Sequence, residues 1–150
     1  MRYLAVLLGA VIVMACNPIE RADEASEKIE RFHADYNAQR DDAIWQRTGQ
    51  EFKDSASRED LQQLIDMVRR NLGQMEESEQ IGINMNSNLN GSFTVVTTKS
   101  HFEKGLANEV FTFIARDDEL ELVGWNVRSD DLMRGVMEDA ARAAESEGAM

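Results

Sequence analysis

The spacing of apolar residues changes from a helical period to a strand period between Gly73 and Ile81. Between Ser57 and Gly73, apolar residues recur on one helical face, at Leu61, Leu64, Ile65, Val68 and Leu72. From Ile81 to Val127, apolar and polar residues tend to alternate, as they do in half-buried strands. Helices followed by strands predict an α+β fold, with N-terminal helices packed on a curled four-stranded antiparallel meander and a C-terminal helix after it.

Three helices are expected before the strands. The first covers about residues 18–38, because Asn17 is a good N-cap and a proline follows it at the first helical position. A second, short helix begins at Asp41, and the apolar residues of this segment are Ile44, Trp45 and Phe52. Gly49 and the run 53–56 mark a break before the next helix. The third begins after Ser57, with acidic residues in its first turn.

Four strands are expected near residues 81–87, 93–102, 109–114 and 120–127. The Asn90-Gly91 pair predicts a hairpin turn between the first two strands. The apolar parity shifts between Leu122 and Trp125, and a bulge near Gly124 would return both side chains to one face. A final helix is expected over residues 130–144, followed by a frayed tail.

Residues 1–15 have the pattern of a secretory signal peptide. Arg2 supplies the positive charge, and the roughly thirteen apolar residues after it are too few for a membrane-spanning helix. Small Ala15 precedes Cys16, the only cysteine. We therefore expect one mature domain over residues 16–150, with its core at about 18–129.

The stretch Val13-Met14-Ala15-Cys16 resembles the lipobox of bacterial lipoproteins. This resemblance implies cleavage after Ala15, a diacylglycerol thioether on Cys16 and an N-acyl chain such as palmitate. Asn17, where an Asp would imply retention at the inner membrane, favours the periplasmic face of the outer membrane. The outer face of the inner membrane and secretion remain alternatives, as does an ordinary secretory signal or uncleaved anchor with a chance cysteine.

The order of elements, with a Trp-containing strand that closes the meander in Leu-Val-Gly-Trp-Asn-Val, resembles the cystatin-like, nuclear-transport-factor-2-like cone superfamily. The similarity is to small secreted domains of unknown function within it. It implies the fold over roughly residues 20–129. Such cones include isomerases, cyclases and non-enzymatic binding modules, so the resemblance does not imply an activity.

Charge excludes one class of partner. Without residues 1–15, which contain only Arg2, the chain keeps 16 − 1 = 15 basic residues against 28 acidic ones, a formal charge of −13. Nucleic acid binding requires a cationic surface, so we expect no nucleic acid partner. We also expect no cofactor and no metal, because no set of ligands has the necessary spacing.

Catalytic candidates are few. On the first helix, Tyr36 is the only mature tyrosine that could donate to an oxyanion, and His33 is the nearest candidate base. No acid stands out as facing inward, and Asp41 and Asp42 are expected to cap the second helix. Ordinary structural roles are favoured for both, with Tyr36 as a core residue whose hydroxyl lies at the rim and His33 as a helix residue without a catalytic role. The larger aromatic residues line a pocket or fill the core: Trp45, Phe52, Phe111, Phe113 and Trp125.

These patterns favour a membrane-anchored periplasmic lipoprotein that acts as a non-enzymatic binding or accessory module. Its expected partners are the lipid membrane, through acylated Cys16, and either a protein or an apolar small ligand. The alternative is a small-molecule isomerase- or cyclase-type enzyme of the cone superfamily. A homodimer through the open face of the sheet is a further expectation.

Overall fold

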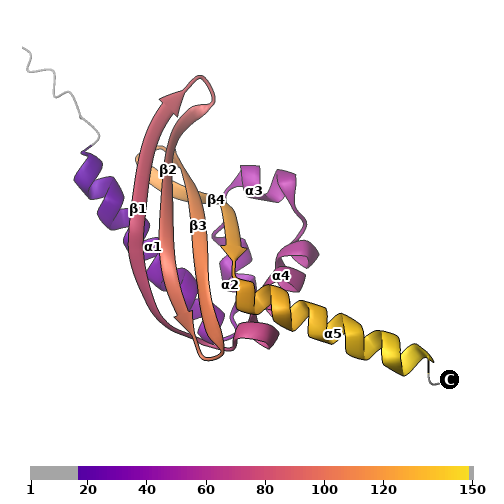
Figure 1. Cartoon of the computed structure of the whole chain (residues 1–150). Helices are drawn as coiled ribbons and strands as arrows, with labels where there is room; N and C mark the ends of the chain where they lie inside the picture. The colour runs from indigo at the N-terminus through magenta and orange to yellow at the C-terminus, as the bar shows by residue number, and fades with distance from the viewer. Residues whose placement is uncertain (1–16, 149–150) are drawn as a thin grey trace, which may run out of the picture.

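The computed structural model describes residues 17–148 and contains the expected α+β arrangement (Figure 1). In chain order its elements are α1 (Pro18–Asn37), α2 (Asp41–Gln46), α3 (Gln50–Ser55), α4 (Arg58–Leu72), β1 (Met75–Asn88), β2 (Gly91–Phe102), β3 (Gly105–Arg116), β4 (Glu119–Arg128) and α5 (Asp130–Gly148). The predictions for the signal peptide and Cys16 lie outside the described residues. Within residues 17–148, no helix combines the length and the apolar character that crossing a bilayer requires.

The four strands form one antiparallel sheet in the order β1-β2-β3-β4, so each strand pairs with its neighbour in sequence. Helix α1 lies across one face of this sheet, and Figure 1 views the sheet from the opposite face. Helices α2, α3 and α4 lie beside the β4 edge, while α5 projects away from the body. The core therefore forms between α1, the inner face of the sheet and α4.

The expected bulge in β4 is present. Thr112 pairs with Gly124 and Phe113 pairs with Leu122, which leaves one extra residue on β4 between these pairs. Leu122 and Trp125 are both buried as a result. The shift in apolar parity was thus a reliable indication of a bulge.

Helix caps also agree with the sequence. The Oδ1 of Asn17 accepts a hydrogen bond from the backbone N of Ile19 at 3.1 Å, so α1 begins directly after residue 17. Ser57 and Asp60 form a reciprocal capping box at the start of α4. Gly73 ends that helix with φ of 80°, a conformation that favours glycine.

The segment between α1 and α4 differs from the sequence prediction, because it forms two short helices instead of one. The backbone N of Gly49 donates to the carbonyl of Leu122 at 2.8 Å, and Thr48 forms an isolated parallel bridge with Leu122. A Cβ at residue 49 would lie 2.8 Å from Oε2 of Glu121. Close contact with β4 therefore interrupts the helix at this glycine.

Two boundaries also differ. Strand β1 begins at Met75, well before the expected start at Ile81, because its polar first half pairs with the end of β2. Helix α5 continues to Gly148, beyond the expected end near residue 144.

Candidate functional site

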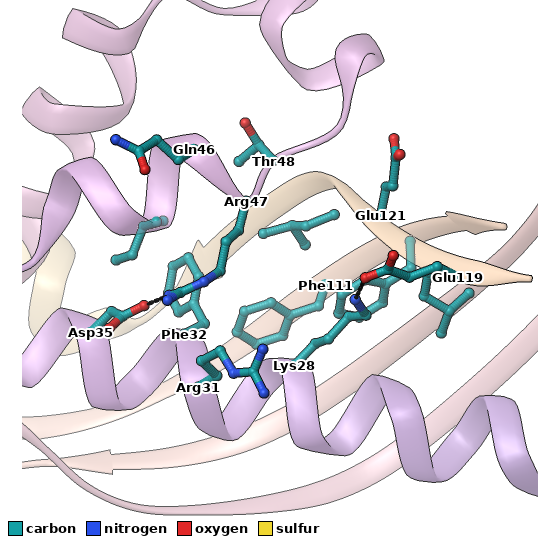
Figure 2. Close-up of a pocket in the computed structure, with 14 residues that line it drawn as sticks. Lys28, Arg31, Phe32, Asp35, Gln46, Arg47, Thr48, Phe111, Glu119 and Glu121 are labelled. Carbon is teal, nitrogen blue, oxygen red and sulfur yellow. Dashed lines mark hydrogen bonds and ion pairs between the residues drawn. The ribbon is translucent and has the colours of Figure 1, made fainter. Parts of the chain in front are cut away.

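A pocket of about 290 Å³ opens between α1, the segment that joins α2 to α3, and the start of β4 (Figure 2). Its apolar residues come from four separate parts of the chain: Phe32, Ile44, Phe111, Phe113, Leu120 and Leu122. Phe32 and Phe111 meet edge to face, with their ring centroids 5.3 Å apart. These side chains give the pocket an aromatic and aliphatic floor that water solvates poorly, while the other eight of its fourteen lining residues are charged or polar.

Charged side chains surround the mouth of the pocket. From α1, Lys28 reaches Glu119 with Nζ 2.9 Å from Oε1, and this hydrogen bond lowers the pKa of the Glu119 carboxyl. One turn further along α1, the exposed Arg31 points toward the mouth and acts on Glu119 only by longer-range attraction (Figure 2). Among residues 17–148, no carboxylate lies within 4.0 Å of the Arg31 guanidinium. Arg31 is thus available to a ligand.

The third cation at the mouth, Arg47, is held by the buried acid Asp35. The carboxylate of Asp35 is almost fully buried and accepts hydrogen bonds from Arg40, at 2.8 Å, and from Arg47. Arg47 extends from the segment after α2 down to α1, as Figure 2 shows. This pairing joins the two elements that flank the pocket and orients the Arg47 guanidinium at its edge.

Behind the pocket lies a buried polar network centred on Glu109 of β3. His33 Nε2 lies 2.9 Å from Glu109 Oε2, and Trp125 Nε1 donates to Glu109 Oε1 at 2.9 Å. The Ser100 hydroxyl also donates to Oε2. Burial by itself would raise the pKa of Glu109, but these hydrogen bonds favour the ionised form more strongly and lower it. An ionised carboxylate only accepts, so the His33 Nε2 atom carries a proton.

The lowered pKa of Glu109 predicts a loss of stability in acid. Because its pKa is lower in the folded state, Glu109 contributes stability that is complete above the unfolded value of about 4.3 and is lost as pH falls through the folded pKa. Urea unfolding at a series of pH values from 7 to 3 measures this effect. Below about pH 4.3, the free energy of unfolding of Glu109→Gln should fall less steeply with pH than that of the wild type. The difference in slope corresponds to at most about one bound proton. Equal slopes for the two proteins would contradict the prediction.

The family described as a protein of unknown function (DUF4019) matches residues 30–125, which is more than half of the chain. The chain belongs to the DUF4019 family. No curated protein and no solved structure matches it. The DUF4019 region contains the Glu109 network and most residues that line the pocket.

The structure of this DUF4019 protein places both catalytic candidates in the interior. Tyr36 is buried, and its hydroxyl donates to the carbonyl of Gly73 at 2.8 Å, so it links α1 to the end of α4. Burial raises the pKa of the Tyr36 phenol. His33 faces Glu109. Neither residue is among those that line the pocket within the described part of the chain.

Of the five aromatic residues proposed as pocket lining, two line the pocket and three do not. Phe111 and Phe113 line the pocket. Trp125 packs against Phe32, with ring centroids 4.8 Å apart, and serves the Glu109 network. The remaining two, Trp45 and Phe52, pack edge to face against each other at 6.3 Å, away from the pocket lining.

No inward-facing acid stood out in the sequence, yet Glu109 and Asp35 are both buried in the structure. One indication was available for Glu109, since it shares a strand face with Phe111 and Phe113. The role expected for Asp41 and Asp42 was wrong. Helix α2 has no side-chain cap, and the two acids bind arginines of α4.

Metal-binding geometry is not found in the part of the chain that the structure describes. No group of three or more His, Cys, Asp or Glu side chains there is arranged to hold an ion. The polar groups around the pocket are two guanidinium groups, one ammonium group, three carboxylates, the Gln46 amide and the Thr48 hydroxyl. This set can bind an anion at the mouth and an apolar body inside.

Proposed function

We propose that this DUF4019 protein is a lipid-anchored periplasmic lipoprotein and that its domain is a non-enzymatic module for binding a small molecule with an apolar body and an anionic group. The observation that carries the proposal is the pocket with an apolar floor and with Arg31 at its mouth, since Arg31 forms no close ion pair among residues 17–148. The ligand class follows from this combination of lining and charge.

The pocket has a suitable size for a short ligand. Its volume of about 290 Å³ is near the lower end of the range of small-molecule sites. An aliphatic or aromatic body would displace water from the phenylalanine and leucine side chains, with a gain of about 0.8 kcal/mol for each buried methylene. An alkyl chain of several carbons therefore supplies most of the binding free energy.

The mouth supports selection of an anion. Arg31 has no carboxylate within 4.0 Å among residues 17–148, so binding an anion there breaks no ion pair. Arg47 is held by Asp35 at the opposite side of the opening. A carboxylate between these guanidinium groups would receive charge-assisted hydrogen bonds.

The anchor is the second part of the proposal. The lipobox-like stretch before Cys16 motivates lipidation, and Asn17 favours the periplasmic face of the outer membrane. Because α1 begins at Pro18, an acylated Cys16 would hold the pocket near the membrane surface without a flexible tether. The packing of α1 across a meander also supports our proposal that the domain belongs among cystatin-like, nuclear-transport-factor-2-like cones.

The enzymatic alternative lacks comparable support. His33 and Tyr36 bond to Glu109 and to the backbone of Gly73, and these bonds occupy the groups that chemistry would need. A protein partner at the pocket mouth is an outcome that the binding experiment can distinguish, because it would not depend on an alkyl chain.

Octanoate and 1-octanol provide a matched test, because they differ in charge and share the alkyl chain. We expect octanoate to bind at one site and Arg31→Gln to weaken it by about two- to fivefold, as expected for one exposed charge contact. Binding of 1-octanol should not change. Isothermal titration calorimetry measures both ligands, and Arg142→Gln on the exposed face of α5 is the matched control.

Equal losses with Arg31→Gln and Arg142→Gln would mean that only the overall charge matters. If neither octanoate nor 1-octanol binds, the pocket proposal itself is contradicted. Neither result bears on the lipid anchor, which is tested separately by the Cys16→Ser variant.

A further inference from the structure

We propose that the β1–β2 hairpin is a second membrane contact, which rests on the same lipid surface that holds Cys16. The contact surface consists of the exposed apolar side chains of the hairpin, and its occupant is a phospholipid bilayer. This inference depends on the lipid anchor proposed above, but not on the pocket or its ligand.

The hairpin is a long uncharged segment in a highly charged protein. From Gln80 to Thr98 the chain contains no Asp, Glu, Lys, Arg or His, whereas charged residues make up 29% of the sequence. Acidic residues begin immediately before it, at Glu79, and the next charge after it is Lys99. A segment without charge avoids the repulsion that the acidic remainder of the protein would meet at an anionic lipid surface.

Apolar side chains of this hairpin are exposed. Ile81 is 53% exposed, Leu89 at the turn is fully exposed, and Ile83 and Met85 are also open to solvent. Edge strands usually carry charged residues that discourage contact with other molecules. Here the second half of the β1 edge has none, so it is suited to an apolar or uncharged surface.

The start of α1 lies beside this part of β1. The side chain of Asn37 bonds to Met75 at 2.7 Å, and Ser26 lies 3.5 Å from Gln80, so α1 and β1 run antiparallel. Residues 26–37 of a helix and residues 75–80 of a strand both span about 16 Å. Continuing both elements by about 12 Å brings Pro18 level with Ile83. The anchor attachment point and the apolar half of β1 are therefore at the same end of the molecule.

Figure 1 agrees with this placement, since the beginning of α1 and the β1–β2 turn both lie in the upper part of the view. Ile19 extends the surface, because it is seven residues from Ser26 and so shares the helix face that meets β1. The opposite end of β1 carries Glu76, Glu77 and Glu79. This separation of charge favours one orientation, with the acidic end away from the lipid.

A bilayer suits the surface better than a second copy does. Acyl chains on Cys16 would hold the hairpin within reach of lipid continuously, which gives this contact a high effective concentration. Two copies of a chain with a formal charge of −12 would instead repel each other as they approached. Leu89 at the turn can insert its isobutyl group among the headgroups, while the neighbouring Asn side chains remain hydrated.

A single fluorescent label tests this contact in the full acylated protein. Leu89→Cys creates the one free thiol, because Cys16 is acylated, and Lys104→Cys provides a control at the opposite turn of the sheet. Each protein carries a nitrobenzoxadiazole label and is reconstituted in vesicles of phosphatidylethanolamine and phosphatidylglycerol. We expect a blue shift at residue 89, with quenching by nitroxide-labelled lipid, and neither change at residue 104.

Water-like emission at both sites, in protein that floats with the vesicles, would overturn this inference and leave the anchor intact. Rapid bismaleimide crosslinking between the thiols of two Leu89→Cys chains would overturn it in favour of a second copy. A protein that does not float would refute the anchor, and this inference with it.

Discussion

Replacing Glu109 with alanine is expected to lower the free energy of unfolding by about 3–5 kcal/mol, because it leaves several buried donors without their shared acceptor, at about 1–3 kcal/mol for each. The substitution would leave the ring nitrogen of His33 and the indole N–H of Trp125 without these partners in the interior, and Ser100 would lose one of its hydrogen bonds. It would also open a cavity between β3 and α1. Since the unfolding free energy of a domain is only about 5–15 kcal/mol, such a loss would leave the fold marginal.

Urea unfolding followed by tryptophan fluorescence measures the effect of Glu109→Ala. The matched control is Glu79→Ala, which removes the same side chain from an exposed position on β1 and should change stability by less than about 0.5 kcal/mol. A double-mutant cycle with His33→Leu would separate the free energy of the His33–Glu109 interaction from the cost of the cavity. A loss below about 1 kcal/mol for Glu109→Ala would show that the network contributes little.

Replacing Cys16 with serine is expected to abolish membrane attachment, because the thioether to diacylglycerol requires a thiol. The precursor should also remain uncleaved, since a lipoprotein signal is processed after lipidation. Fractionation of cells and mass spectrometry of the purified protein measure both effects. Two or more acyl chains bind a membrane stably, so the wild-type protein should appear only in the membrane fraction.

Asn17→Asp is the matched control for Cys16→Ser. It keeps the acylated cysteine, and aspartate is also a good N-cap, so α1 should begin at the same residue. The lipobox resemblance predicts that this variant stays attached but moves toward the inner membrane. Normal processing and attachment of Cys16→Ser would eliminate the lipoprotein proposal and the hairpin contact that depends on it.

Local patterns allowed much of the fold to be predicted. The capping box at Ser57, the hairpin turn before Gly91 and the bulge between Leu122 and Trp125 each depend on a few adjacent residues. Gly49 was recognised as a break, but the short helix α3 that begins directly after it was not predicted. The interruption depends on contact with β4, more than seventy residues later in the sequence.

The candidate site was predicted only in part. Phe111 and Phe113 were named among the large aromatic residues that line a pocket or fill the core, and the structure places both in the pocket lining. Arg31, Asp35 and Arg47 were missed, because a charge on a helix or loop has no periodic signature that separates a pocket mouth from ordinary surface. Their positions depend on how the segment after α2 folds back over α1.

The sequence by itself determined the order of the helices and strands except α3, and it determined the likeness of residues 13–16 to a lipobox, because each of these is encoded in neighbouring residues. Only the tertiary structure decided that His33, Ser100 and Trp125 surround Glu109. The physical reason is that strand parity specifies a face of the sheet, whereas the partner on the helix depends on the packing of α1. The pocket arises from that same packing, where α1, β4 and the segment after α2 leave space between their side chains.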